Sequence, residues 1–470
     1  MNLERGFSTI ELLIAMAFAV IVISGAILVA FGEQSTILGG ETAAEALARA
    51  TGRIGEARAL AREDFNLVNA TTSTDGRYTE TVSVTLLPDF LTKQVTSSVS
   101  WASGRAEPLS VTLTTLVTNL DNVSAPDTCD SSLVGDWTTP TILNPLHAID
   151  ISPDIPTGIA VANGLAYITG SHAGSNSDFF IVNVSDASYP VFANSAQPGI
   201  STGPGLAAVA VAGGYAYVAN RSTAGQLQVI TVTNPSSPTL ATSTRVTGAG
   251  GVGNAIFYYN HMVYLGLTAS GAGPQFAIFD VASSTKPIAK GTYTLGHTVN
   301  AIHVRGRYAY IATAAPEELI VFDISDPMSP QRVSGSGVLP DTTANGKSVY
   351  VVGDTAYLGR TVGLSPSAKQ LYAFDTRNPL TSPLPVLGTP LDLNDSINSL
   401  LVRSHLAFLT TRTEFQVWSL SNLNSLTKVG SLSLASTTPA FDCEQNTLYV
   451  GVTGPDGGGT DALKIIGPGS

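Results

Sequence analysis

Residues 206–246 read LAAVAVAGGYAYVANRSTAGQLQVITVTNPSSPTLATSTRV, and this stretch decides the fold. Its apolar residues alternate in short segments, as β-strands require, at 206–211, 215–220, 227–232 and 239–246. Gly213-Gly214 separates the first two segments, and glycine tolerates the positive φ angles of a tight hairpin. A turn bounded by Pro235 and Pro238 separates the last two. The stretch therefore predicts four short antiparallel strands in a row.

The same four-strand pattern recurs along most of the chain. An aromatic residue of the second strand marks each unit at intervals of 50, 47, 46, 47, 51 and 41 residues: Tyr167, Tyr217, Tyr264, Tyr310, Tyr357, Phe408 and Tyr449. Repeats of this length indicate a solenoid or a propeller. The third strand, for example Ile320-Val-Phe-Asp-Ile324, resembles the repeat of the LVIVD family of β-propellers. The resemblance implies an all-β, seven-bladed propeller over residues 138–470, but it leaves the function open because propellers have many roles.

The first and last parts of the repeat region complement each other. The seventh unit has three strand patterns, of which the last lies at 461–466. Residues 140–151 carry the turn and fourth-strand pattern without a preceding unit. We therefore expect residues 140–151 to complete the seventh blade, so that an N-terminal strand closes the propeller and leaves no free edge.

This closure relates the two cysteines of the chain to each other. Cys129 precedes the closing strand, and Cys443 lies in the blade that this strand completes. We predict that the two form a disulfide bond; the alternative is a pair of separate buried thiols. Neither cysteine belongs to a CxxC motif or has the Cys/His spacing of a metal site.

The segment before the repeats is apolar and has the length of a membrane span. Residues 12–32 carry no charge, and a helix of this length crosses the core of a bilayer. Glu11 lies at the edge of the run, where a carboxylate needs a partner. Three interpretations compete: a secretory signal peptide, a simple membrane anchor and a type IV pilin-like leader.

Residues 6–15, GFSTIELLIA, resemble the processing signal of type IV pilins and pseudopilins. The resemblance implies a prepilin leader at residues 1–6, cleavage after Gly6 by a prepilin peptidase, and N-methylation of Phe7. It also implies that Glu11 pairs with the Phe7 amine of a neighbouring subunit in the assembled pilus. The implied partners are other pilin subunits, contacted through the N-terminal helix, the prepilin peptidase and, before assembly, the membrane.

Residues 7–125 are then expected to form a pilin-like α+β region with a long helix and a small antiparallel sheet. A narrow apolar stripe at helical spacing supports the helix: Leu47, Ala50, Ile54, Ala57 and Ala61. The stripe suits packing on the chain's own sheet or inside a fibre. Alternating residues predict strands near 82–86, 95–101 and 109–117, and residues 126–137 have the composition of a linker.

Composition and motifs argue against several functions. The formal net charge of −12 disfavours binding to nucleic acid, which relies on a surplus of Lys and Arg. The six histidines lack the spacing of metal ligands, and no motif of a catalytic nucleophile is present. We therefore expect no enzymatic activity, no catalytic residues, no metal site and no cofactor.

These observations predict a minor type IV pilin-like subunit with a binding role. It would reside first in the inner (cytoplasmic) membrane and then at the pilus or cell surface, with an extracytoplasmic propeller. The propeller would bind an unknown surface ligand, a protein or a glycan, in adhesion. Two alternatives stay open: a pseudopilin of a type II secretion-like system, and a hydrolase anchored by a pilin-like segment.

Overall fold

A computed structural model gives the structure of the chain. It describes residues 40–63, 68–86, 92–102, 108–118, 129, 133–171, 176–271, 273–314, 316–365, 368–403, 405–454 and 459–469. The chain divides into two compact units, residues 1–119 and 120–470, and each is described by itself.

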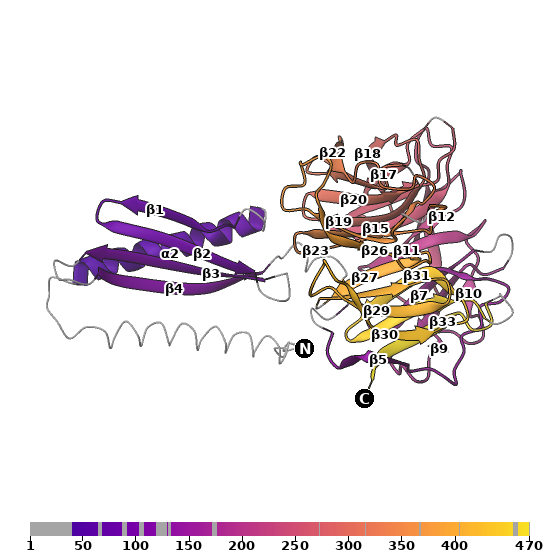
Figure 1. Cartoon of the computed structure of the whole chain (residues 1–470). Helices are drawn as coiled ribbons and strands as arrows, with labels where there is room; N and C mark the ends of the chain where they lie inside the picture. Colours follow the sequence, from indigo (N-terminus) through magenta and orange to yellow (C-terminus); the bar gives the residue numbers. More distant parts are fainter. Residues whose placement is uncertain are drawn as a thin grey trace, which may run out of the picture. The chain divides into compact units, whose positions relative to one another are not determined.

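The first unit packs a helix on an antiparallel sheet (Figure 1). Helix α2 spans Gly40–Glu63, and the strands follow in sequence order: β1 Thr71–Asp75, β2 Tyr78–Leu86, β3 Thr92–Ala102 and β4 Pro108–Thr118. Of the predicted apolar stripe, all but Leu47 is buried, and Ala46 takes the place of that residue. The sequence missed β1, because its residues TTSTD show no apolar alternation.

Of the predicted long helix, the structure describes only residues 40–63. Helix α2 has 24 residues, and residues 7–39, which include the predicted membrane span, lie outside the described residues. Across the described ranges, no helix is both long enough and apolar enough to cross a membrane.

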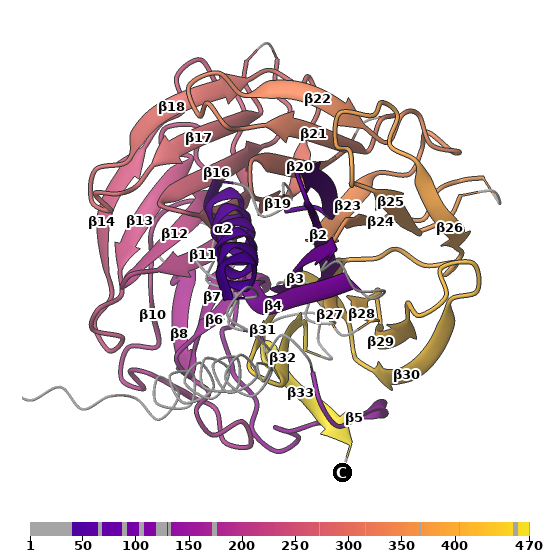
Figure 2. The same cartoon turned by 90° about the vertical axis from the view of Figure 1, so that its left-hand side faces the viewer.

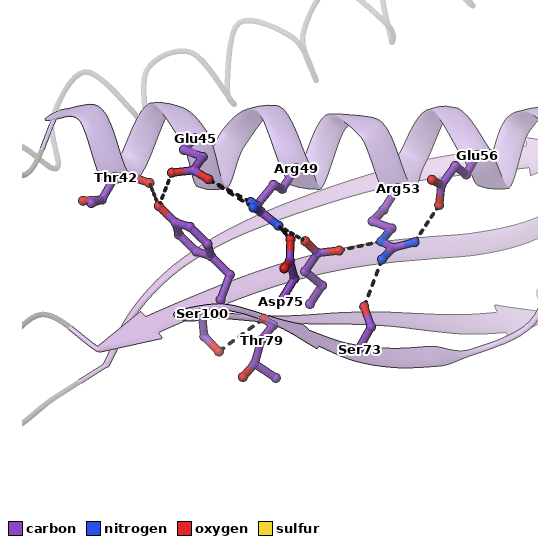
Figure 3. A network of polar contacts seen from close by, with 11 residues as sticks. Thr42, Glu45, Arg49, Arg53, Glu56, Ser73, Asp75, Thr79 and Ser100 are labelled. Carbon is purple, nitrogen blue, oxygen red and sulfur yellow. Dashed lines mark hydrogen bonds and ion pairs between the residues drawn. The ribbon is translucent and has the colours of Figure 1, made fainter.

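A polar network also joins the helix to the sheet (Figure 3). The Arg49 guanidinium donates to Asp75 at 2.7 Å and to Glu80 at 2.9 Å, so it bridges β1 and β2. Arg53 donates to the other oxygen of Glu80 at 2.6 Å. Within the helix, Arg49 also pairs with Glu45, four residues earlier, at 3.1 Å. Arginines that the sequence places outside the apolar stripe therefore fix the helix to the sheet.

The second unit is made of antiparallel sheets, and seven lie within the residues that the structure describes. We number them in chain order. Sheet 1 holds β6 Pro156–Ala162, β7 Leu165–Gly170, β8 Phe179–Asn183, β9 Val191–Phe192 and β10 Gly199–Ile200. Sheet 2 holds β11 Leu206–Ala212, β12 Tyr215–Asn220, β13 Leu227–Thr231 and β14 Thr239–Thr244. Sheet 3 holds β15 Gly253–Tyr259, β16 Met262–Leu267, β17 Phe276–Asp280 and β18 Ile288–Tyr293. Sheet 4 holds β19 Val299–Arg305, β20 Tyr308–Thr313, β21 Leu319–Asp323 and β22 Gln331–Gly335. Sheet 5 holds β23 Gly346–Val352, β24 Thr355–Arg360, β25 Leu371–Asp375 and β26 Val386–Leu391. Sheet 6 holds β27 Ser399–Arg403, β28 Leu406–Thr410, β29 Glu414–Ser419 and β30 Thr427–Ser433. Sheet 7 holds β31 Thr437–Glu444, β32 Thr447–Val452, β33 Leu463–Gly469 and β5 Asp136–Ile142.

The sheets are arranged around one axis, with their first strands innermost (Figure 2). The first strand of each sheet lies beside the first strand of the next, and β31 of sheet 7 lies beside β6 of sheet 1. Neighbouring sheets bury apolar side chains between them, so the second strands are covered on both faces. This burial explains their nearly continuous apolar sequence. The predicted β-propeller part of the fold is confirmed.

Sheet 7 takes its outer strand from an earlier part of the chain. Strand β5 pairs with β33 in antiparallel register, with Ile142 opposite Ile466 and Thr141 opposite Gly467. The predicted bounds of this strand, 140–151, are wrong: β5 spans Asp136–Ile142 and begins inside the predicted linker, 126–137.

Two side chains explain the observed bounds of β5. Trp137 is buried against Phe408 of sheet 6, with ring centroids 5.0 Å apart, so the core contact begins earlier than the repeat pattern indicates. Beyond the strand, the Asn144 side chain accepts from Ile465 N at 2.9 Å and donates to Leu463 O at 3.0 Å. The Asn144 amide therefore hydrogen-bonds to backbone groups of β33 at the point where strand pairing ends.

Candidate functional site

The residues predicted for processing and assembly lie outside the described part of the chain. Gly6 and Phe7, predicted for cleavage and N-methylation, and Glu11, predicted for pilus assembly, therefore stay predictions.

The two cysteines are joined where the chain enters the propeller. Cys129 and Cys443 form a disulfide bond with their Cα atoms 5.2 Å apart. Close by, Val134 N donates to the Asn446 side chain at 3.0 Å, and that side chain donates back to Val134 O at 2.9 Å. The segment before β5 is thus attached to the β31–β32 hairpin, and a disulfide that closes so long a loop contributes about 4–5 kcal/mol in the chain-entropy model.

Repeated aspartates at the ends of third strands have a local structural role. Asp280, Asp323 and Asp375 each accept a hydrogen bond from the backbone N–H two residues later, at 2.9–3.0 Å. These bonds close the turn after the strand. Within the described ranges, no group of three or more His, Cys, Asp or Glu side chains is placed to hold a metal ion.

The first strands carry a candidate site at one repeated position. The residue seven places before each repeated aromatic lies directly opposite it in the neighbouring strand: Ala160, Ala210, Phe257, His303, Tyr350, Leu401 and Asp442. In sheets 3, 4 and 5 this residue has a ring. The His303 ring lies 5.1 Å from that of Phe257 and 4.7 Å from that of Tyr350, centroid to centroid. The three rings form a continuous aromatic cluster across three sheets.

The electrostatic surroundings keep the histidine of this cluster neutral. Burial and the charges of Arg403 and Arg305 lower the pKa of His303 to about 3. The Arg403 guanidinium donates to the Tyr350 hydroxyl and lies 5.3 Å from the centre of its ring. A general acid or base needs a pKa near the working pH, so the cluster suits contact with a ligand better than proton transfer.

A second repeated position carries side-chain hydrogen bonds between neighbouring sheets. In sheets 1 to 5 the first strand carries a β-bulge ten residues before the repeated aromatic: Thr157, Ala207, Asn254, Asn300 and Lys347. The Thr157 hydroxyl donates to the first carbonyl of β11 at 2.8 Å. Asn254 and Asn300 donate to the first carbonyls of β19 and β23, both at 2.7 Å. Asn398, ten residues before the aromatic of sheet 6, donates to the first carbonyl of β31 at 3.3 Å.

Sequence reasoning missed both of these positions. The signal that could have found them is their constant offset from the repeated aromatic, seven residues for the aromatic cluster and ten for the bulges. Both positions lie in first strands, where the alternation of apolar and polar residues indicates only ordinary packing.

A comparison with protein families supports the repeat. The family model described as LVIVD repeat matches residues 157–197, 206–246 and 296–334. The second unit carries LVIVD repeats. The matched stretches begin at or next to first strands of sheets 1, 2 and 4, and none of them falls within residues 1–119.

Solved structures that resemble the chain are distant. The BamB from Moraxella catarrhalis is 12% identical, with 67% of this chain and 84% of that chain covered and a TM-score of 0.43. The Pan2 WD40 domain from Neurospora crassa is 12% identical, with 71% and 97% covered and a TM-score of 0.46. The computationally designed Ika8 protein is 10% identical, with 68% and 98% covered and a TM-score of 0.46. No curated protein matches the sequence.

Proposed function

We propose that the chain is a minor type IV pilin-like subunit that displays its propeller at the pilus tip or cell surface. There the propeller binds a protein or a glycan in adhesion. The observation that carries the proposal is the order of parts along the chain. The pilin-like signal at 6–15 and the apolar run at 12–32 come first, a helix on a small sheet follows, and a separate propeller comes last.

The first unit supports the assembly part of the proposal. Helix α2 begins at Gly40, shortly after the apolar run, and lays Ala50, Ile54 and Ala57 against the sheet. A helix followed by a small antiparallel sheet is the arrangement that the resemblance to pilins implies. In the proposed pilus, Glu11 would lie in the helical bundle and pair with the Phe7 amine of the next subunit, because a buried carboxylate needs an opposite charge.

The second unit supports the display part. A propeller of residues 138–470 is bulky to repeat along a densely packed fibre, which favours a minor or tip position. The disulfide between Cys129 and Cys443 is the kind of bond that persists in oxidising, extracytoplasmic compartments. Within the second unit, it joins Cys129, near the start of that unit, to strand β31 of sheet 7.

Immuno-electron microscopy with antibodies against the propeller tests the proposal. We expect label at pilus ends for the unmodified chain and its loss from pili in the variant Glu11→Gln, which stays in the membrane. Glu45→Gln is the matched control, because it removes the same charge from a residue of the first unit that pairs with Arg49 and should leave pilus label in place. Label confined to the cell envelope in all three would contradict pilus display and fit the pseudopilin alternative.

Mass spectrometry of the mature chain tests the processing step separately. We expect an N-terminal, methylated Phe7, because cleavage after Gly6 exposes this residue. A mature chain that keeps residues 1–6, or one cut downstream of the apolar run, would remove the pilin interpretation.

A further inference from the structure

The outer strands of the propeller sheets carry features that hinder pairing with another chain. In sheets 2 to 7 a register shift interrupts the pairing of the outer strand with its neighbour. In sheet 1 the outer strands β9 and β10 have only two residues each. Three outer strands also carry a cation: Lys290, Arg332 and Lys428. Register shifts, short length and charge are the devices with which proteins prevent association through sheet edges.

Strand β4 of the first unit has none of these features. It is the last strand in the sheet order β1-β2-β3-β4, so β3 alone pairs with it among the strands that the structure describes. This pairing runs without a shift over the whole strand, from Thr118 opposite Thr92 to Pro108 opposite Ala102. The 11 residues of β4, PLSVTLTTLVT, include no charged residue, and the proline stands first. The outer edge of β4 is therefore long, regular and uncharged.

Strand β1, at the opposite edge of the same sheet, is short and ends in a charge (Figure 1). It has five residues, and the last of them, Asp75, pairs with Arg49 of the helix at 2.7 Å. The exposed Arg77 follows in the turn to β2. A strand added beside β1 would find few backbone partners and would meet these charges. Of the two edges of this sheet, β4 is therefore the one suited to pairing with a further strand.

The side chains of β4 leave apolar surface on both faces of the strand. Leu113 packs in part against the core beneath α2, whereas Leu109, on the same face, is 46% exposed. Leu116, on the other face, is 51% exposed. A strand added at this edge would cover part of both exposed leucines, and burial of apolar surface favours association. The edge thus combines apolar side chains with backbone groups to which no described strand is bonded.

We propose that β4 pairs in antiparallel orientation with β4 of a second copy of this chain, so that two sheets join into one across a two-fold axis. Full overlap of the two strands places Leu113 opposite its own copy and Thr112 opposite Thr114. Leucine then meets leucine on the helix side, and threonine meets threonine on the other face, where hydroxyl pairs stabilise a sheet. Two copies of an uncharged strand also meet without the repulsion of like charges, which favours a second copy as the partner. This dimer contact goes beyond the proposed display role.

Sedimentation velocity of the detergent-solubilised full chain, over a range of protein concentrations, tests the contact. We expect a reversible dimer that Thr112→Lys/Thr114→Lys weakens roughly tenfold, because two pairs of like charges then face each other across the contact. Both threonines are exposed, so the variant should fold normally. Thr81→Lys/Ser83→Lys is the matched control and should leave the dimer unchanged. These two exposed residues lie in the same cross-strand rows and on the same face, but on the inner strand β2.

Mixing two charged variants shows whether the two copies contact each other through β4. Neither Thr112→Lys/Thr114→Lys nor Thr112→Glu/Thr114→Glu should dimerise alone, whereas an equal mixture should dimerise, because opposite charges then face each other. Variants that had lost their fold would not regain association on mixing. An unmodified chain that stays monomeric would overturn the proposal and leave the edge to a strand of another protein. Equal dimerisation of the unmodified chain and the lysine variant would also overturn it, since another part of the chain would then associate.

A variant with one charge of each sign tests the register of the two strands. Thr112→Lys/Thr114→Glu should dimerise at least as strongly as the unmodified chain, because full overlap places each lysine opposite a glutamate of the other copy. A shift of two residues would instead place equal charges opposite each other, so loss of the dimer in this variant would overturn the full-overlap pairing. These measurements do not depend on pilus labelling, so failure of the dimer contact and failure of the display role are distinguishable.

Discussion

Two carboxylates, one in each unit, are paired with arginines, yet their pKa values shift in opposite directions. Glu318 of the propeller and its partner Arg360 are both fully buried. Burial raises the pKa of Glu318, and the hydrogen bonds from Arg360 offset this effect only in part. Glu80 of the first unit accepts from Arg49 and Arg53, and these hydrogen bonds lower its pKa. Each carboxylate accepts two hydrogen bonds from arginine. The complete burial of the Glu318–Arg360 pair, and the second, partly exposed arginine beside Glu80, therefore decide whether the charge is favoured, rather than pairing itself.

The surroundings of Glu318 show what its position requires. The residue before the third strand is fully or almost fully buried in sheets 1 to 5: Asp178, Gln226, Gln275, Glu318 and Gln370. The three glutamines accept backbone N–H groups of the loop toward the next sheet, at 2.8–3.0 Å. The repeat therefore needs a buried acceptor here, and a charge is an exception that needs compensation.

Arg360→Met should have the largest effect on stability. It leaves Glu318 buried without its cation and removes donors from the carbonyls of Pro340, Asp341 and Lys369. Removing one partner of a buried ion pair costs about 3–5 kcal/mol, because the other charge stays buried without compensation. Urea unfolding of the variant should show a loss of this size.

The double variant Arg360→Met/Glu318→Gln separates the charge from the packing. Glutamine is the residue that sheets 2, 3 and 5 have at this position, so we expect it to recover about 2 kcal/mol or more. No recovery would mean that the carbonyl contacts of Arg360, and not the unpaired carboxylate, carry the loss.

Asp178→Asn should stabilise the propeller at neutral pH. Asp178 accepts from Thr202 N at 2.8 Å and from its hydroxyl, but no cation pairs with it among the described residues, and burial raises its pKa to about 6. A raised pKa means that the folded state binds the proton more tightly, so stability is lost as pH rises from about 4 to about 6. An amide avoids this loss, which amounts to at most about 3 kcal/mol for a shift of this size.

The pH dependence checks the cause of that gain. The difference in free energy of unfolding between Asp178→Asn and the unmodified chain should be large at pH 7 and shrink toward pH 4. A gain of constant size across this range would place its origin in packing or hydrogen bonding instead of ionisation.

These comparisons also show which parts of the molecule the sequence could predict. The propeller was predictable, because strands buried on both faces leave apolar runs that repeat with an aromatic marker. The start of β5 was not, because Trp137 packs on Phe408 of another sheet. The bulged positions of the first strands were not predicted either, since Asn254 and Lys347 look like ordinary polar residues in the sequence and only the fold shows that they share a position. Of the predicted sites, the structure brings together the cysteines, whereas Gly6, Phe7 and Glu11 lie beyond its described residues.

Glu80→Gln should destabilise the first unit by a smaller amount. The variant keeps the shape of the side chain but weakens the bonds from Arg49 and Arg53, whose side chains are 26% and 33% exposed. Solvent reaches these arginines, so we expect a loss of about 1 kcal/mol. Because the pKa of Glu80 is lowered, its contribution is present above pH 4.5 and is lost as pH falls below that value. A loss as large as that of Arg360→Met would contradict the role assigned to depth of burial.

Arg377→Gln should have the smallest effect of all, although its ion pair with Asp375 has the same chemistry as the buried one. The Arg377 side chain is 72% exposed, so water solvates the charge when the pair is absent. Asp375 keeps its bond from the backbone N–H of residue 377, at 3.0 Å, whatever side chain stands there. We therefore expect no change in the free energy of unfolding beyond experimental error, and little dependence on salt. If Arg377→Gln instead weakened the propeller as strongly as Arg360→Met, exposure would not decide the value of an ion pair in this fold.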